Sequence, residues 1–200
     1  GALGTLGVIT EVSFKVLPQP AEEATLAFPL EQAAAIEQAN RWAGQPLPLS
    51  AAAWEAGVLR VRLSGAPAAV AAARAKMGGE EDPRGAEHWE ALREQRLAFF
   101  GGAAPLWRVS VPQTTPPLLP QHPQLVDWGG GVRWIRGELD AAAVRDAAQR
   151  AGGHATLFRG GDKSAGVFHP LAPALLKIHR RLKAAFDPAG ILNPGRMYDF

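Results

Sequence analysis

The chain has 200 residues, of which 47% are hydrophobic and 20% are charged, with a formal net charge of +2. This composition favours a folded protein of one or two domains and argues against both a disordered chain and a nucleic-acid partner. The chain has no cysteine, which excludes disulfides and thiolate metal or iron–sulfur ligands from it, and no apolar run is long enough to span a membrane. We therefore expect a soluble, cytoplasmic protein.

The chain opens on a glycine-rich turn that leads into an alternating segment. Apolar and polar residues alternate over 8–16, which predicts a half-buried strand, and prolines follow at 18 and 20. Because there is no starting methionine and no preceding element, we expect residue 1 to lie inside a larger protein. The strand would then form a sheet edge or pair with a second copy, giving a homodimer of this fragment.

The following segments predict the order β-α-β-β-α-β of a split, ferredoxin-like unit. They are a strand over residues 25–29, a helix from 30, a hairpin of 49–54 and 58–63, an alanine-rich helix over 67–77 and a strand over 106–111. A further helix over 87–99 interrupts this order before the last strand. The expected fold class is α+β, an antiparallel sheet with helices on one face.

The remaining segments form a second, loosely repeated half. Five prolines between 112 and 123 predict an ordered crossing rather than a flexible connection, although both fit the composition. Then come a second hairpin of 125–128 and 132–135, a helix from Asp140 to about 151 and a strand over 155–158.

The last helix carries an apolar stripe and a basic face. The stripe is formed by Leu175, Ile178, Leu182 and Phe186. The basic residues Lys177, Arg180, Arg181 and Lys183 are interpreted as its solvated face, in preference to an anion or partner site. Among the tryptophans, Trp107 beside the proline-rich segment is the candidate for a partner contact.

Two terminal segments and three internal motifs resemble a known family. GALGTLGVITEVSFKVLP resembles the end of the FAD-binding domain in flavoproteins of the vanillyl-alcohol-oxidase superfamily, and DPAGILNPGRMY resembles the C-terminal signature of its FAD-linked oxidases. LWRVSVPQTTPP, DWGGGVRW and GGHATLFRGGD are similar to the FAD-binding subunits of glycolate oxidase, of the GlcE type.

This resemblance implies a domain division and a set of cofactor contacts. Residues 1–20 match the end of the FAD-binding domain, including its last strand, and 21–200 match the cap, or substrate, domain with an FAD-facing tail. Because the family's upstream pyrophosphate loop has no match here, we expect this fragment to hold FAD weakly by itself. The residues matching the family's flavin contacts, expected to lie near one another, are Gly4, Thr5, Leu6, Gly7, Val8, Ile9 and Asn193.

The resemblance also implies an activity and partners. The activity is oxidation of glycolate or a related 2-hydroxy acid by hydride transfer to FAD, in a complex with a catalytic flavoprotein subunit and an iron–sulfur subunit that could hold it at the inner membrane. Among the polar residues, His154 suits proton transfer and Arg159 suits a carboxylate clamp, and we predict no metal ligands. The alternatives are that both residues stabilise a loop and that the protein is a non-catalytic subunit that docks its partners.

Overall fold

The computed structural model describes residues 1–199 as two compact units. One unit combines residues 1–18 with 164–199, and the other is Gln19–Lys163. The predicted boundary after residue 20 lies two residues from the observed one. The region 21–200, expected to be a cap domain with an FAD-facing tail, is divided after Lys163, and its C-terminal tail makes hydrogen bonds with the opening turn.

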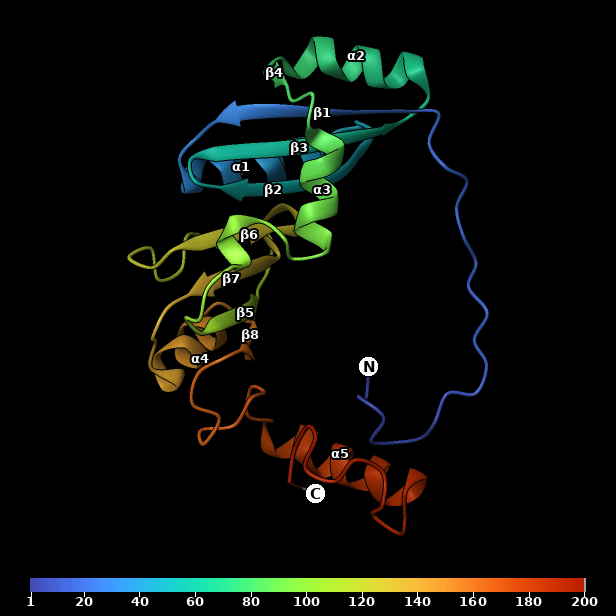
Figure 1. The fold of residues 1–200 in the computed structure, drawn as a ribbon, viewed down its shortest axis with the longest axis vertical. Coiled ribbons are helices and arrows are strands. Elements are labelled where there is room, and N and C mark those ends of the chain that lie inside the picture. The colour runs from blue at the N-terminus through green and yellow to red at the C-terminus, as the bar shows by residue number, and fades with distance from the viewer. Residues whose placement is uncertain (200) are drawn as a thin grey trace. The chain divides into compact units, whose positions relative to one another are not determined.

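The larger unit contains an eight-stranded antiparallel sheet, so the α+β class is confirmed (Figure 1). The strand order is β4-β1-β3-β2-β6-β7-β5-β8. The strands are β1 (Glu22–Pro29), β2 (Leu49–Glu55), β3 (Val58–Gly65), β4 (Glu80–Glu81), β5 (Leu106–Ser110), β6 (Gln124–Asp127), β7 (Val132–Arg136) and β8 (His154–Arg159).

The helices follow the predicted order, with one division. They are α1 (Gln32–Ala43), α2 (Pro67–Met77), α3 (Gly85–Arg93), the 3₁₀ turns η1 (Ala98–Phe100) and η2 (Trp128–Gly130), α4 (Ala141–Arg150) and, in the smaller unit, α5 (Pro173–Phe186). The helix predicted over 87–99 is divided because Gln95 has a φ of 55°, which a right-handed helix cannot contain. Asp140 caps α4 as predicted, its carboxylate accepting the Ala143 N–H.

The sheet is a topological repeat of two split units. The first half has the ferredoxin-like order 4-1-3-2, but its fourth strand is β4, not the predicted 106–111 segment, which begins the second half. Strands β5 to β8 repeat this order in the opposite direction along the sheet, as β6-β7-β5-β8. The halves are joined by β2 and β6 through two residue pairs, Trp54 with Val126 and Glu55 with Leu125.

Three helices cover one face of this sheet and one lies on the other. Leu59, Val61 and Leu63 lie at alternate positions of β3 and pack on α1 and α2. The strand pairing from β2 through β6 to β7 places Ile135 on the same face of the sheet, where it packs on α4. The prediction that helices lie on one face holds for these three. Helix α3 contradicts this prediction and lies on the opposite face (Figure 1). Its Gly85 packs so closely on Thr25 that a Cβ would lie 2.2 Å from the threonine hydroxyl.

The proline-rich segment takes the place of a first helix in the second half. Arg133, which is fully buried, donates to the carbonyl of Thr115 at 2.7 Å, and Gln124 donates to the carbonyls of Leu118 and Leu119. Burial lowers the pKa of Arg133 to about 10. The predicted ordered crossing is therefore confirmed.

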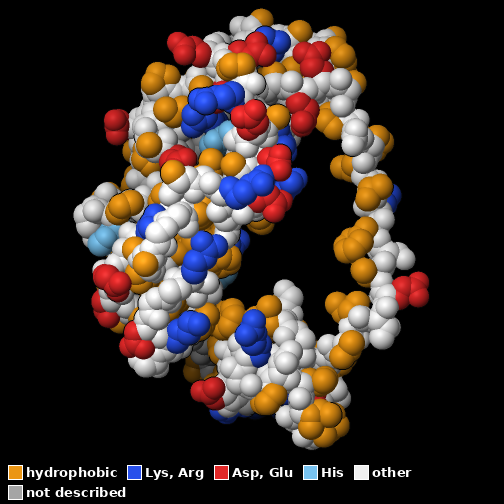
Figure 2. All heavy atoms as spheres, viewed as in Figure 1, with side chains coloured by type: hydrophobic (Ala, Val, Ile, Leu, Met, Phe, Trp, Pro, Cys, Tyr) orange, Lys and Arg blue, Asp and Glu red, His pale blue; other side chains and the backbone are white. Residues whose placement is uncertain are grey.

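The segment predicted as a strand over 8–16 is extended but pairs with no other segment among residues 1–199. Its apolar side chains are open to solvent: Val8, Val12, Phe14 and Val16 are 60% exposed or more (Figure 2). A strand requires a neighbour for its backbone ladder, which the alternating pattern alone does not supply.

A pair of glycine variants tests how tightly the second hairpin is held. At Gly130, with a φ of 111°, an alanine Cβ would lie 2.3 Å from the Gln113 carbonyl oxygen, whereas Gly57, with a φ of 82°, faces open space. We expect Gly130→Ala to lower the free energy of unfolding by roughly 3 kcal/mol and Gly57→Ala by about 1 kcal/mol, measured by urea unfolding. Equal losses would show that the Gln113 contact is unimportant.

Candidate functional site

The opening turn and the C-terminal tail meet at Asn193. Its side-chain amide donates to the Leu3 carbonyl at 3.0 Å, so the expected proximity of these two segments is present. Gly4 lies directly beneath this amide with a φ of 73°, and a Cβ there would lie 2.7 Å from Asn193 Nδ2. Glycine at this position is therefore required both by the backbone conformation and by the close approach of the asparagine.

Lys183 ties the same two segments together from within α5. Its ammonium donates to the carbonyls of Thr5 at 2.9 Å and Leu192 at 2.7 Å and to Asp187 Oδ2 at 2.6 Å. The side chain of Lys183 is only 12% exposed. The prediction that it lies on a solvated face was therefore wrong, and the signal that identifies it is an acid four residues later, at the end of the helix.

Asp187 organises the turn that follows the helix. Its carboxylate accepts the backbone N–H groups of Ile191 at 3.2 Å and Leu192 at 2.8 Å, in addition to the Lys183 ammonium. The hydrogen bond from Lys183, followed by that from the Leu192 amide, lowers the pKa of Asp187 below its ordinary value.

Asn193 lines two cavities. One, of about 250 Å³, is lined by Leu6, Leu182, Met197 and Tyr198 among others, and the second, of about 420 Å³, includes Ile191. All seven residues predicted to contact a cofactor line one or both cavities: Gly4, Thr5, Leu6, Gly7, Val8, Ile9 and Asn193. The structure thus brings this predicted set together.

His154 and Arg159 lie in the other unit, at the two ends of β8. Four residues lie between them, and the five extended steps from one to the other correspond to about 16 Å. The Arg159 guanidinium donates to the Phe100 carbonyl at 3.2 Å and to Gln95 Oε1 at 2.6 Å. The structure therefore does not bring these two side chains to one small ligand.

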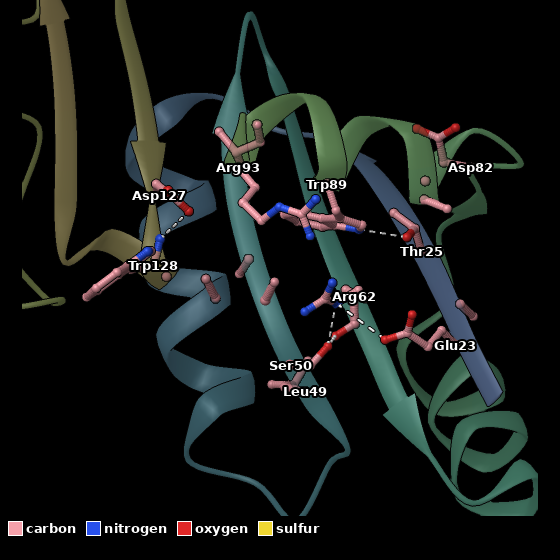
Figure 3. A pocket seen from close by; sticks show the side chains of 18 of the residues that line it. Glu23, Thr25, Leu49, Ser50, Arg62, Asp82, Trp89, Arg93, Asp127 and Trp128 are labelled. Carbon is pink, nitrogen blue, oxygen red and sulfur yellow. Dashed lines mark hydrogen bonds and ion pairs between the residues drawn. The ribbon is translucent and has the colours of Figure 1, made fainter. Parts of the chain in front are cut away.

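The larger unit also has a cleft of about 910 Å³ beneath α3 (Figure 3). Trp89 crosses it, donating to Thr25 Oγ1 at 2.8 Å, and Arg62 lies below the indole with its guanidinium 5.7 Å from the ring centre. Arg62 donates a hydrogen bond to Ser50 Oγ at 2.8 Å and forms an ion pair with Glu23 at 3.7 Å. Because this charge is already paired, we assign no ligand to this part of the cleft.

A hydrogen-bonded loop that lines this cleft presents Trp128. The tryptophan has a φ of 54° and is 67% exposed. The loop carbonyls accept hydrogen bonds from Gln113 at 3.1 Å, Asn40 at 3.2 Å and Arg133 at 2.9 Å. Trp107, predicted as a partner contact, is 2% exposed and packs against α4, so that prediction was wrong.

Replacing Lys183 tests whether it holds the turn against the tail. Lys183→Met removes three donated hydrogen bonds, so we expect faster amide exchange in residues 2–6 and 190–193. Lys177→Met, at an exposed position of the same helix, is the matched control and should leave both segments unchanged. Equal exchange in the two variants would contradict this role for Lys183.

The lowered pKa of Asp187 predicts a pH dependence. Its stabilising contribution is present above the ordinary aspartate pKa of about 4 and is lost as the pH falls through the lower pKa of the folded state. Protection of the Leu192 amide should therefore decrease in strongly acidic solution. In Asp187→Asn the protection should be low at every pH, whereas a pH-dependent loss in this variant would point to another group.

Comparison with known proteins relates this geometry to a family. Residues 160–197 match the family described as FAD linked oxidases, C-terminal domain. The chain is 41% identical over 198 residues to the glycolate oxidase subunit GlcE of Escherichia coli (strain K12), covering 99% of this chain and 55% of that protein. The chain thus spans about half the length of the curated relative that it matches. Nearly the whole chain is therefore similar to one part of the glycolate oxidase subunit GlcE, and its C-terminal segment is similar to the C-terminal domain of FAD-linked oxidases.

Proposed function

We propose that this chain is the cap and FAD-facing tail of a glycolate oxidase FAD-binding subunit. The observation that carries the proposal is the 41% identity to such a subunit over nearly the whole chain. In the proposed reaction, glycolate or a related 2-hydroxy acid loses a hydride from the carbon bearing the hydroxyl and a proton from the hydroxyl, giving the 2-oxo acid. FAD, when bound, supplies the two-electron acceptor that takes the hydride.

The arrangement around Asn193 suits one edge of a flavin site. Gly4 lies where any Cβ would collide with Asn193, and the adjoining cavities are lined largely by apolar side chains and backbone. Such surfaces accept a flat ring, and the Asn193 amide oxygen remains as an acceptor, since only its nitrogen is bonded to Leu3. Residues 4–9 and Asn193 would hold the cofactor, with Lys183 positioning both segments.

We further propose that His154 handles the substrate proton. Its imidazole is exposed at the start of β8, where it is open to a ligand. We do not assign Arg159 to the substrate carboxylate, because its guanidinium already donates to the Phe100 carbonyl and to Gln95 Oε1.

The proposed partners are a catalytic flavoprotein subunit and an iron–sulfur subunit. With no cysteine among its 200 residues, this chain provides no thiolate ligands for an iron–sulfur cluster. Any cluster would therefore be held by cysteines outside these 200 residues, and we propose that they belong to the iron–sulfur subunit.

A second candidate is a non-catalytic subunit that docks these partners. It is favoured by the distance between His154 and Arg159 along β8, which leaves no paired acid–base and carboxylate site of the predicted kind. Anaerobic addition of glycolate to the full-length protein distinguishes the two: bleaching of the flavin absorbance supports catalysis, and bound flavin without bleaching supports docking alone.

The flavin site is tested by Gly4→Ala in the full-length protein. The new Cβ would collide with Asn193 Nδ2, so we expect FAD content to fall at least several-fold, measured from the flavin absorbance per protein. Gly57→Ala carries a comparable backbone strain in open space and should retain FAD. Normal FAD content in Gly4→Ala would refute the placement of the cofactor beside this turn.

A further inference from the structure

Arg108 on β5 is a fixed guanidinium on the sheet face that carries α3. Its Nη1 donates to Ser110 Oγ at 2.9 Å. Its central carbon lies 5.8 Å from the ring centre of Trp128 and 5.9 Å from that of Trp134. Two aromatic rings and a hydroxyl therefore hold the cation in one position, which reduces the ordering needed when a ligand binds.

Arg108 has no ion pair of the kind that Arg62 forms on the same face of the first half-sheet. Arg62 also bonds a serine and lies over a tryptophan, but Glu23 is 3.7 Å away. Within residues 1–199 no carboxylate lies within ion-pair distance of Arg108. Asp127 interacts electrostatically with Arg108 from beyond ion-pair distance, but its Oδ1 accepts the Trp128 N–H at 2.7 Å and burial raises its pKa.

The strand register places further polar groups beside Arg108. Ser110 pairs with His154 and Arg108 pairs with Thr156, so these four side chains lie on one face of β5 and β8. His154, proposed for proton transfer, is thus a cross-strand neighbour of the serine that Arg108 contacts. Arg159 lies at the far end of β8, paired with Leu106.

The conformation of Trp128 supports a function at this position. A tryptophan with a positive φ is strained, and such strain persists only where surrounding contacts enforce it. Here Asn40, Gln113 and Arg133 hold the loop from three separate elements. The result of this constraint is an exposed indole fixed against the Arg108 guanidinium.

We propose that Arg108 binds the carboxylate of the 2-hydroxy acid substrate, beside His154, in place of the Arg159 suggested by the sequence. This inference rests on the proposed function. A guanidinium that forms no ion pair within the described residues, next to serine and threonine hydroxyls, provides the charge and the donors that a small carboxylate requires. The rings of Trp128 and Trp134 and the hydroxyl of Ser110 determine the orientation of the Arg108 guanidinium.

The test uses the full-length protein assembled with its partner subunits. The variants are Arg108→Gln and Arg108→Lys, with Arg62→Gln as the matched control and Arg159→Gln as the competing assignment. For each, FAD content, kcat and KM for glycolate are measured. Binding of oxalate, a carboxylate with no hydride to lose, is followed by the fluorescence of the tryptophans, since Trp128 contacts Arg108.

If Arg108 binds the carboxylate, Arg108→Gln should raise the KM for glycolate and the Kd for oxalate by roughly 10- to 100-fold with FAD content unchanged. Arg108→Lys should recover part of this loss by keeping the charge, and Arg62→Gln and Arg159→Gln should change both constants less than about threefold. The proposal would be overturned if Arg108→Gln left the KM for glycolate and the Kd for oxalate near those of the unsubstituted protein. It would also be overturned if Arg159→Gln changed them more than Arg108→Gln does. Oxalate binding that depends on Arg108, in a protein that does not oxidise glycolate, would support the carboxylate site and refute the proposed activity.

Discussion

The short pairing between β2 and β6 is the constraint on which the larger unit depends. Only two residue pairs join the two half-sheets, yet they set the register that continues the helix-covered face from β3 to Ile135. The same junction brings α1 of the first half to the second hairpin, where Asn40 donates to the carbonyls of Gln113 and Gly129. The first half thus supplies one of the three hydrogen bonds that hold the Trp128 loop beside Arg108, and the candidate carboxylate site depends in part on the union of the repeats.

Three cations show how the environment of a charge distinguishes structural from functional positions. Arg133 is fully buried and bonds the carbonyls of Thr115 and Gly130, which anchors the proline-rich crossing and the glycine loop. Lys183 bonds a carboxylate and two carbonyls and joins the opening turn to the tail. Arg108 contacts a hydroxyl and two rings and forms no ion pair within the described residues, which is the basis for proposing that it binds an anion.

Much of the fold could be predicted from the sequence, because local patterns specify local elements. Alternation predicted both hairpins, Asp140 predicted the start of α4, and the repeated order of strands predicted two halves. The fourth strand of the first half was missed because β4 is only two residues long, too short for any periodicity. The predicted cofactor residues depended on the resemblance of two distant segments to one family, and the structure places those segments together at Asn193.

The sequence by itself determined the α+β class, the order of the elements and the glycine positions that permit close backbone approach. Only the tertiary structure decided which charges are compensated, because an ion pair depends on groups far apart in the chain. Glu23 reaches Arg62 across neighbouring strands, whereas no acid among the described residues forms an ion pair with Arg108. The sequence likewise could not distinguish a buried Trp107 from an exposed Trp128. Spacing along the chain reports the face of an element, but burial depends on what covers that face.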